Sequence, residues 1–389
     1  MASSIVKTPL IRIVSARGYS QLAPISGIQN YEIKSSVLSN KLVVAAGDNE
    51  SAITRISIVF RSIHKNSSQF AITRNIQQVG ANLTATSDRE TIAYTLEGTR
   101  AAVEKALPFL TEVATQQVFK PWEVSDVSNR ILLEIATRPL QLRAVDLLHN
   151  AAFRTGLGNS LFVPKSQIGK ISSETLQHYV ASNFLSGRAA VIGLGVSSGE
   201  LTQYAQSLKI NTGDGCLNPS PYKGGELRSN KGGDVAFVAV AGEGAGLKDS
   251  KEALAFAVLQ RAVGIGPQIK YSTRDNGILT KTIGSAQEYA AAAINVSYFD
   301  SGLFGVLLAL PSKCSRKVVE SAVKLLTSST VSDEDVTRGK NQLKAALLLD
   351  AESGANAIHN FGTQAVLLQC LQTRARSLGR RLYNYKRCQ

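Results

Sequence analysis

Long hydrophobic runs and cysteine motifs are both missing from this sequence of 389 residues. No segment approaches the roughly 18–20 apolar residues that cross a bilayer, so we expect a protein that does not span a membrane. The four cysteines, Cys216, Cys314, Cys370 and Cys388, include no CxxC pair. Their spacing fits neither a zinc site nor a dense disulfide framework, and we interpret them as small buried or idle thiols. The composition, 44% hydrophobic and 19% charged, is globular, and the length suits two domains.

Acidic residues are missing from both ends of the chain, and this explains most of its basic charge. The formal net charge is +14. Residues 1–19 contribute +3 and residues 370–389 contribute +6 without any acid, which leaves +5 for the body of the chain. That charge is ordinary, and no basic stripe alternates with aromatic residues as in single-strand binders. The sequence therefore does not favour a nucleic-acid partner.

The first 31 residues have the composition of a targeting segment. They contain no Asp or Glu and carry several Ser and basic residues, as mitochondrial transit peptides do. The stretch Arg17-Gly18-Tyr19-Ser20 resembles a processing site in which Arg lies three residues before the first mature residue. We predict a transit peptide over residues 1–19, cleaved between Tyr19 and Ser20. The alternative is a disordered basic N-terminus that is not removed.

One order of strands and helices occurs twice along the chain. In both halves apolar spacing predicts a strand, then a hairpin, a helix and a longer helix. The first half has strands at 42–45 and 53–60, a hairpin at 83–97, helices at 103–113, 121–135 and 173–184, and a strand at 188–196. The second half has a strand at 234–240, a helix at 249–263, a hairpin at 290–310, a helix at 319–326 and a long helix from 332. We interpret the repeat as a duplicated α+β unit, with helices packed on one face of a mainly antiparallel sheet.

Three helix starts are predicted from single residues. Pro121 is a favourable first-turn residue for the helix that follows it. Asp249, with Glu252 three residues later, has the pattern of a capping box, and so does Ser332 with Asp335.

The two copies are unequal, and each lacks a different part. Aligning Arg89 with Ser301 gives an offset of 212 residues, whereas aligning Val59 with Phe237 gives 178. The first half is therefore about 34 residues shorter between strand and hairpin and lacks a counterpart of the 249–263 helix. The second half is truncated, because nothing after its long helix matches the 173–184 helix and the 188–196 strand. We predict a first repeat at 32–210, a linker at 211–232, a second repeat at 233–369 and a divergent basic tail at 370–389.

Several segments resemble one protein family. They are Tyr222–Arg228 (YKGGELR), Ile192–Val196, Gly266–Lys270, Asp300–Gly305, Lys340–Ala345 and, less tightly, Thr73–Ile76 and Val79–Gly80. In order and spacing they resemble the mitochondrial processing peptidase, or insulinase-like, family over roughly residues 32–366. The segment 222–228 in particular is similar to the interdomain segment of the core subunits of respiratory complex III.

The resemblance implies two bowl-like α+β halves that face each other. Active members of the family are zinc peptidases, and the core subunits are relatives on the matrix side of the inner mitochondrial membrane. It further implies a peripheral subunit whose partners are a core protein 1-like paralogue and other complex III subunits. No cofactor, metal ligand or catalytic residue is expected.

The histidines do not form the family's catalytic motif. Such a zinc site needs His-x-x-Glu-His on one helix. The four histidines are His64, His149, His178 and His359, and no two lie closer than 29 residues in the sequence. His64 is nearest to the expected position but is followed by Lys-Asn-Ser, so we interpret it as a loop residue.

A glycine-rich turn supports two weaker enzyme hypotheses. Gly193–Gly199 resembles a dinucleotide-binding turn, but its third glycine is one place late. It also contains the G-x-S-x-G pattern that would present Ser197 as a hydrolase nucleophile, with His359 as the one later histidine. We interpret this segment as an ordinary strand-to-helix turn.

Three functions therefore compete. The first is a structural subunit, and the second is a non-catalytic, presequence-binding partner of a processing peptidase. The third is an enzyme, either NAD-dependent or a serine hydrolase. The second should carry a glycine-rich loop, whereas residues 263–271 hold only Gly264 and Gly266. The sequence favours the first.

Overall fold

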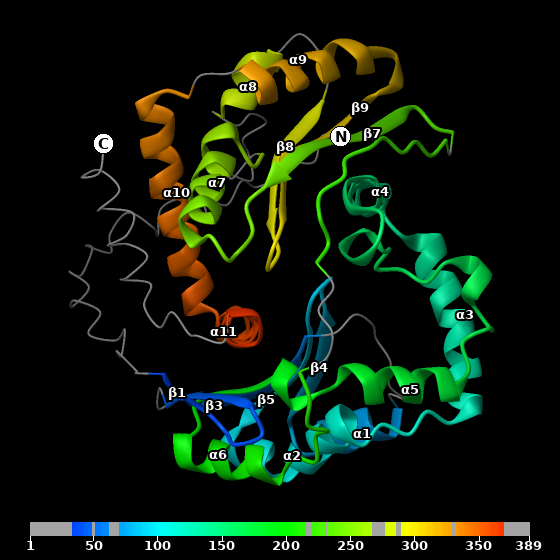
Figure 1. The fold of residues 1–389 in the computed structure, drawn as a ribbon, viewed down its shortest axis with the longest axis vertical. Helices are drawn as coiled ribbons and strands as arrows, with labels where there is room; N and C mark the ends of the chain where they lie inside the picture. Colours follow the sequence, from blue (N-terminus) through cyan, green and yellow to red (C-terminus); the bar gives the residue numbers. More distant parts are fainter. Residues whose placement is uncertain are drawn as a thin grey trace, which may run out of the picture.

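The computed structural model describes residues 33–48, 51–61, 70–214, 219–230, 232–266, 277–284, 289–328 and 331–368. Within them the chain forms two α+β halves, each with its own sheet and covering helices (Figure 1). The predicted fold class is confirmed. The predicted transit peptide and basic tail lie outside the described residues.

The first half is built on a six-stranded sheet of order β1-β2-β6-β3-β5-β4. All neighbouring strands are antiparallel except β2 and β6. Its strands are β1 (Lys34–Val37), β2 (Val43–Gly47), β3 (Ile53–Phe60), β4 (Asn82–Ser87), β5 (Ile92–Thr99) and β6 (Ala189–Leu194). Its helices are α1 (Phe70–Gln78), α2 (Arg100–Thr115), α3 (Pro121–Thr137), α4 (Leu140–Phe153), α5 (Ser173–Asn183) and α6 (Ser198–Ser207).

The second half has a smaller sheet, with the order β7-β9-β8 among the described residues. Its strands are β7 (Val235–Gly244), β8 (Ala290–Ser297) and β9 (Gly302–Pro311). Its helices are α7 (Ser250–Val263), α8 (Ile278–Ile283), α9 (Ser315–Ser328), α10 (Asp333–Glu352) and α11 (Gly354–Leu368). No helix in the described ranges is both long and apolar enough to cross a membrane.

The three helix starts predicted from single residues are confirmed. Pro121 is the first residue of α3. The Asp249 carboxylate accepts a hydrogen bond from the Glu252 amide at 3.1 Å and caps α7. The Ser332 hydroxyl accepts one from the Asp335 amide at 3.2 Å and caps α10. These contacts satisfy amides that have no partner inside the helix.

Strand register shows how the two halves correspond. Phe60 of β3 pairs with Ile92 of β5, and Gly242 of β7 pairs with Phe304 of β9. Ile92 and Phe304 differ by 212 positions, as the hairpin alignment requires, whereas Phe60 and Gly242 differ by 182. The first half is thus shorter by 30 residues, and the sequence estimate of 34 was wrong. The register makes α8 the counterpart of α1, a helix the sequence analysis did not predict, and leaves α7 with no counterpart in the described first half.

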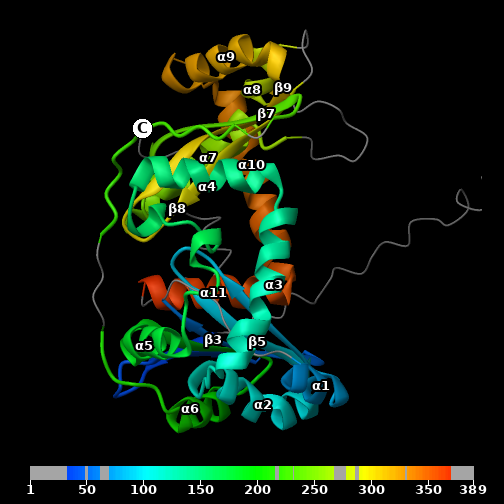
Figure 2. The ribbon, with the colours of Figure 1, turned by 90° about the vertical axis from the view of Figure 1, so that its right-hand side faces the viewer.

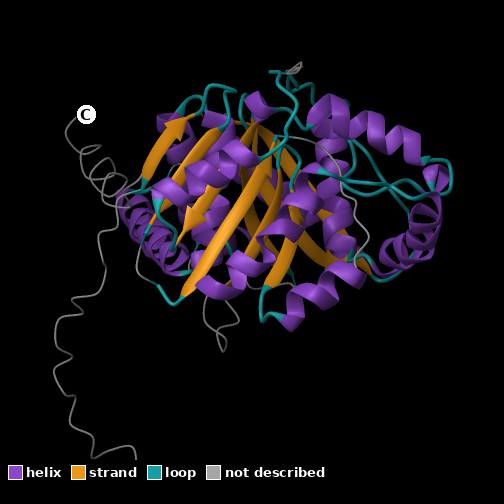
Figure 3. Cartoon of the chain, turned by 90° about the horizontal axis from the view of Figure 1, so that it is seen from below, coloured by secondary structure: helices purple, strands orange, loops and turns teal. Residues whose placement is uncertain are grey.

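The first sheet is covered on both faces, which corrects the prediction of helices on one face only. One face packs against α2 and α6 through a large apolar cluster, and Figure 3 shows helices lying across the strands on the side seen from below. The opposite face packs against α11, a helix the sequence analysis did not predict. The periodicity of a segment reports its own apolar side chains, but it does not say which distant sheet will bury them.

Candidate functional site: the junction between the halves

Each half contributes one helix to the sheet of the other half (Figures 1 and 2). Phe153 of α4 forms one apolar cluster with Leu303 of β9. Ile358 of α11 forms another with Val59 of β3. Gly362 allows this close approach, because a Cβ at that position would lie 2.6 Å from Cγ2 of Val59. The exchange of helices ties the two sheets together through buried apolar surface.

The hairpin turns of the two halves meet at Glu90 and Phe299. The Glu90 carboxylate accepts a hydrogen bond from the Phe299 amide at 3.0 Å. Arg61 pairs with Glu90 at 3.6 Å, and its guanidinium lies 4.3 Å from the centre of the Phe299 ring. Burial raises the pKa of the Glu90 carboxyl, while Arg61 opposes that shift. Burial also lowers the pKa of Arg61, so both charged groups are partly removed from water.

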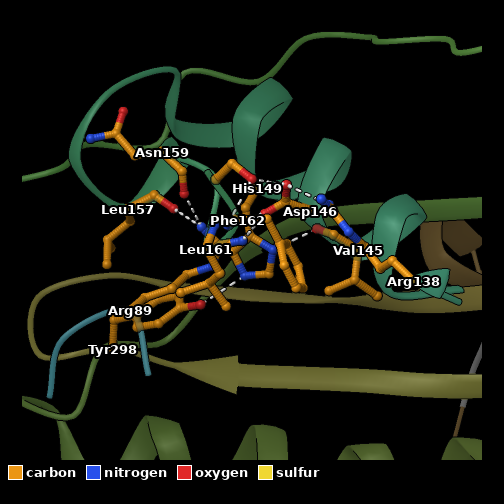
Figure 4. A network of polar contacts seen from close by, with 11 residues as sticks. Arg89, Arg138, Val145, Asp146, His149, Leu157, Asn159, Leu161, Phe162 and Tyr298 are labelled. Atoms are coloured by element: carbon orange, nitrogen blue, oxygen red, sulfur yellow. Dashed lines mark hydrogen bonds and ion pairs between the residues drawn. The ribbon is translucent and has the colours of Figure 1, made fainter. Parts of the chain in front are cut away.

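Arg89 is the most enclosed charge of the junction (Figure 4). Its guanidinium is 6% exposed and donates to the carboxylate of Asp146 on α4 at 2.8 Å. It also donates to the carbonyl of Leu157 at 2.9 Å and to the carbonyl of Asn159. The Ser160 hydroxyl donates to the second carboxylate oxygen of Asp146 at 2.5 Å. Arg89 therefore fixes the first hairpin turn to α4 and to the loop that follows it.

His149 continues this network from α4 to the second half. Its Nδ1 lies 2.7 Å from the Val145 carbonyl, and its Nε2 lies 2.7 Å from the Tyr298 hydroxyl. A carbonyl can only accept, so Nδ1 carries the proton and Nε2 accepts from Tyr298. Burial, together with the charge of Arg89, lowers the pKa of His149 to about 4. The imidazole is thus a neutral part of the junction at neutral pH.

His359 makes the corresponding contact from α11 to the first half. Its Nε2 lies 3.3 Å from the Asp88 carboxylate in the first hairpin turn. The hydrogen bond with Asp88 raises the pKa of His359, although burial opposes the shift. Each exchanged helix thus carries one histidine that contacts the hairpin of the other half.

The residues of the junction do not fit a catalytic or zinc site. His149, His178 and His359 lie on three separate helices, α4, α5 and α11. Within the ranges that the structure describes, no three His, Cys, Asp or Glu side chains gather as metal ligands would. The acid and base groups of the junction bond to one another, which holds the halves in place. His64 and the predicted processing residues Arg17, Tyr19 and Ser20 lie outside the described residues.

The glycine-rich turn also has a structural role. The Ser197 hydroxyl accepts a hydrogen bond from the Glu200 amide at 3.3 Å and caps α6. His359, its one candidate base in the sequence, contacts Asp88 instead. The predicted strand-to-helix turn between β6 and α6 is confirmed, and this arrangement does not support the hydrolase hypothesis.

Sequence reasoning missed Arg89, Asp146 and Tyr298. Arg89 and Tyr298 stand beside the predicted hairpin turns, so a charged or polar aromatic residue at matching ends of both hairpins was the available signal. Asp146 lies inside a helix that the sequence analysis did not predict, and nothing local indicates its partner.

Comparisons with known proteins give the context of this architecture. Residues 57–165 match the family described as insulinase (peptidase family M16), and residues 170–343 match the peptidase M16 inactive domain. Cytochrome b-c1 complex subunit 2 of Mus musculus is 33% identical over 87% of this chain and 82% of its own length. The Homo sapiens protein of the same name is 34% identical over the same shares.

More distant similarities are of two kinds. A probable mitochondrial-processing peptidase subunit alpha-1 of Arabidopsis thaliana is 27% identical over 77% of this chain and 62% of its own length. A chain in a structure of complex III2 from Candida albicans superposes with a TM-score of 0.73, covering 90% of both chains at 18% identity. That second similarity concerns the fold.

Proposed function

Because this chain belongs to the M16 (insulinase) peptidase family, we propose that it is a non-catalytic structural subunit of mitochondrial respiratory complex III. The carrying observation is the 33–34% identity to cytochrome b-c1 complex subunit 2, core protein 2 of that complex, over 87% of the chain. The family resemblance inferred from the sequence is confirmed. The subunit would lie on the matrix side of the inner mitochondrial membrane, bound to a core protein 1-like paralogue and to other complex III subunits.

The absence of catalysis has its own physical support. The sequence contains no His-x-x-Glu-His motif, and residues 170–343 match a domain described as inactive. The register leaves the first half without a described counterpart of α7 on α3. Two metal-binding histidines one turn apart need such a helix to share a face. We therefore propose that the chain binds no catalytic zinc and cleaves no presequence.

The junction supports a scaffold role, because a scaffold must present its surfaces in a fixed relation. Two exchanged helices and a buried ion pair hold one sheet against the other. The proposed units are residues 32–210 and 233–369, with a linker at 211–232 and a tail at 370–389. A transit peptide over residues 1–19, removed between Tyr19 and Ser20, would deliver the chain, and N-terminal sequencing of the mature protein tests that step.

Native electrophoresis of mitochondria that express a tagged copy tests the proposal. We expect the tag to migrate with assembled complex III, and the purified assembly to contain no zinc attributable to this chain. A matched control is Gly199→Ala, since a Cβ at this position meets no atom within 4 Å. A tag found only as monomer or aggregate would contradict the proposal.

A second candidate function is a presequence-binding partner of a processing peptidase. It is favoured by the 27% identity to a processing peptidase alpha subunit. A fluorescent presequence peptide separates the two, because a structural subunit should leave its anisotropy unchanged at micromolar protein. Saturable binding would favour the second candidate.

A further inference from the structure

The second sheet lacks the strand that lies at the centre of the first sheet. In the first half β6 lies between β2 and β3, parallel to β2 and antiparallel to β3. In the second half β7 is an edge strand that pairs with β9 alone among the described strands (Figure 1). The two halves therefore differ at one defined strand position.

The register identifies both sides of that position. At the offset of 182, Arg55–Phe60 of β3, which pairs with β6, corresponds to Phe237–Gly242 of β7. The same offset places β2 on residues 225–229, and the connections 48–52 and 230–234 have equal length. Residues 225–229 are described but form no strand. We infer that they are a β2-like segment that has no neighbour to pair with.

Burial agrees with this correspondence. Every residue of β2 is buried, and so is every residue of β3 from Ile56 to Phe60. By contrast, residues 237–241 of β7 are only half-buried, and Leu227 is 47% exposed. A central strand would cover both segments, as β6 does in the first half.

The edge of β7 is also chemically open. The strand contains no Lys, Arg or Pro, and its one charge, Glu243, lies near its exposed end. It pairs with β9 over ten consecutive positions without a bulge. Natural edge strands usually carry one of these protections against pairing with another chain. The other edge of the sheet is covered, since the Ala293 amide of β8 donates to the Gly264 carbonyl at 2.8 Å.

We propose that the β7 edge, Phe237–Gly242 together with residues 225–229, binds an extended segment of a partner polypeptide by strand addition. The segment would run antiparallel to β7 and parallel to 225–229, as β6 does between β3 and β2. Its chemistry follows from β6, Ala-Ala-Val-Ile-Gly-Leu: about six uncharged, small or β-branched residues. Backbone hydrogen bonds would supply affinity, and the alternating side chains would supply specificity.

Hydrogen–deuterium exchange of the full chain tests the proposal, with a synthetic peptide of residues 187–197 as the probe. We expect saturating peptide to slow exchange of the amides in 225–229 and 235–244 by about tenfold or more, while the amides of β4 stay unchanged. A peptide carrying V191P and G193P should have no effect, because proline removes the donors that a strand needs.

A charge on the edge provides the matched protein control. Ala239→Lys should weaken peptide binding at least tenfold, whereas Thr86→Lys on the exposed edge strand β4 should leave it unchanged. No protection by the peptide would overturn the proposal. Protection already present without peptide would also overturn it: the chain's own residues fill the position if that protection is independent of protein concentration, and a second copy fills it if protection rises with concentration.

Discussion

The two halves of this molecule share one order of elements, and each lacks a neighbour that the other keeps. The second half retains α7 against α10, while the corresponding helix of the first half, α3, has no such cover among the described residues. Conversely, the first half retains β6 against β3, while β7 has an open edge. In both cases the remaining element still forms, but it stays half-buried. Local sequence thus determines that the element forms, and its neighbour determines how deeply it is buried.

The pair α10 and α3 shows this difference residue by residue. Gly339 of α10 lies so close to α7 that a Cβ there would be 2.8 Å from the Val258 carbonyl oxygen. The guanidinium of Arg338 donates to the carbonyl of Ala262 at 2.9 Å. On α3 no residue is buried, and Trp122 and Leu133 are 63% and 64% exposed.

The largest expected effect comes from the junction that holds the unequal halves together. Arg89→Ala should lower the free energy of unfolding by about 3–5 kcal/mol, because it leaves the buried carboxylate of Asp146 without its partner. Chemical denaturation measures the change. Arg100→Ala removes an exposed ion pair with Glu200 and should leave the unfolding midpoint unchanged. Equal losses in the two variants would show that the junction does not dominate stability.

The two histidines of the exchanged helices should respond to pH in opposite directions. The pKa of His149 is about 4 in the folded protein and about 6.5 in the unfolded chain. Between these values only the unfolded state takes up the proton, so stability should fall by up to roughly 3 kcal/mol as pH drops from 6.5 to 4. His149→Gln should flatten this slope, measured by denaturation across that range.

His359 contributes in the opposite sense, because its pKa is raised. Its contact with Asp88 stabilises the fold at low pH and is lost as pH rises through the raised pKa. The effect should be small, since the side chain is partly exposed to solvent. A steeper acid slope in His359→Gln than in the parent would agree, and an unchanged slope would show that this contact is energetically silent.

Much of this comparison could be predicted from the sequence. Alternation located β3 and both hairpins, and single capping residues located the starts of α7 and α10, because these signals lie within a few residues of each other. The unequal halves and the missing counterpart of α7 followed from the repeat. The junction could not be predicted, because Arg89 and Asp146 are 57 residues apart, and nothing local to either indicates that they meet. The helix α11 was missed because its apolar side chains are buried by strands of the other half.

Exchanging matched residues sharpens the comparison of the long helices. The offset of 212 aligns Val127 of α3 with Gly339 of α10. Gly339→Val should cost about 1–3 kcal/mol, because the added atoms press on the backbone of α7. Val127→Ala on the half-buried face of α3 should cost less than that, and thermal unfolding of both variants decides. A larger loss from Val127→Ala would mean that α3 is better covered than the structure shows.

The smallest effect is expected on the outer side of α3. Leu133→Lys should change the free energy of unfolding by no more than about 0.5 kcal/mol, because this leucine is already mostly in water. Solubility should rise, since an exposed apolar side chain is replaced by a charge. A loss of several kcal/mol in denaturation would mean that Leu133 packs against part of the protein.

The most direct test of the central claim is functional replacement. Mitochondria lacking their own core protein 2 would receive this chain, either unchanged or carrying Arg89→Ala, and assembled complex III would be measured by native electrophoresis with ubiquinol–cytochrome c reductase activity as readout. The account predicts that the unchanged chain restores the complex and that Arg89→Ala restores less of it. A well-expressed, folded chain that never enters the complex would contradict the structural role proposed here.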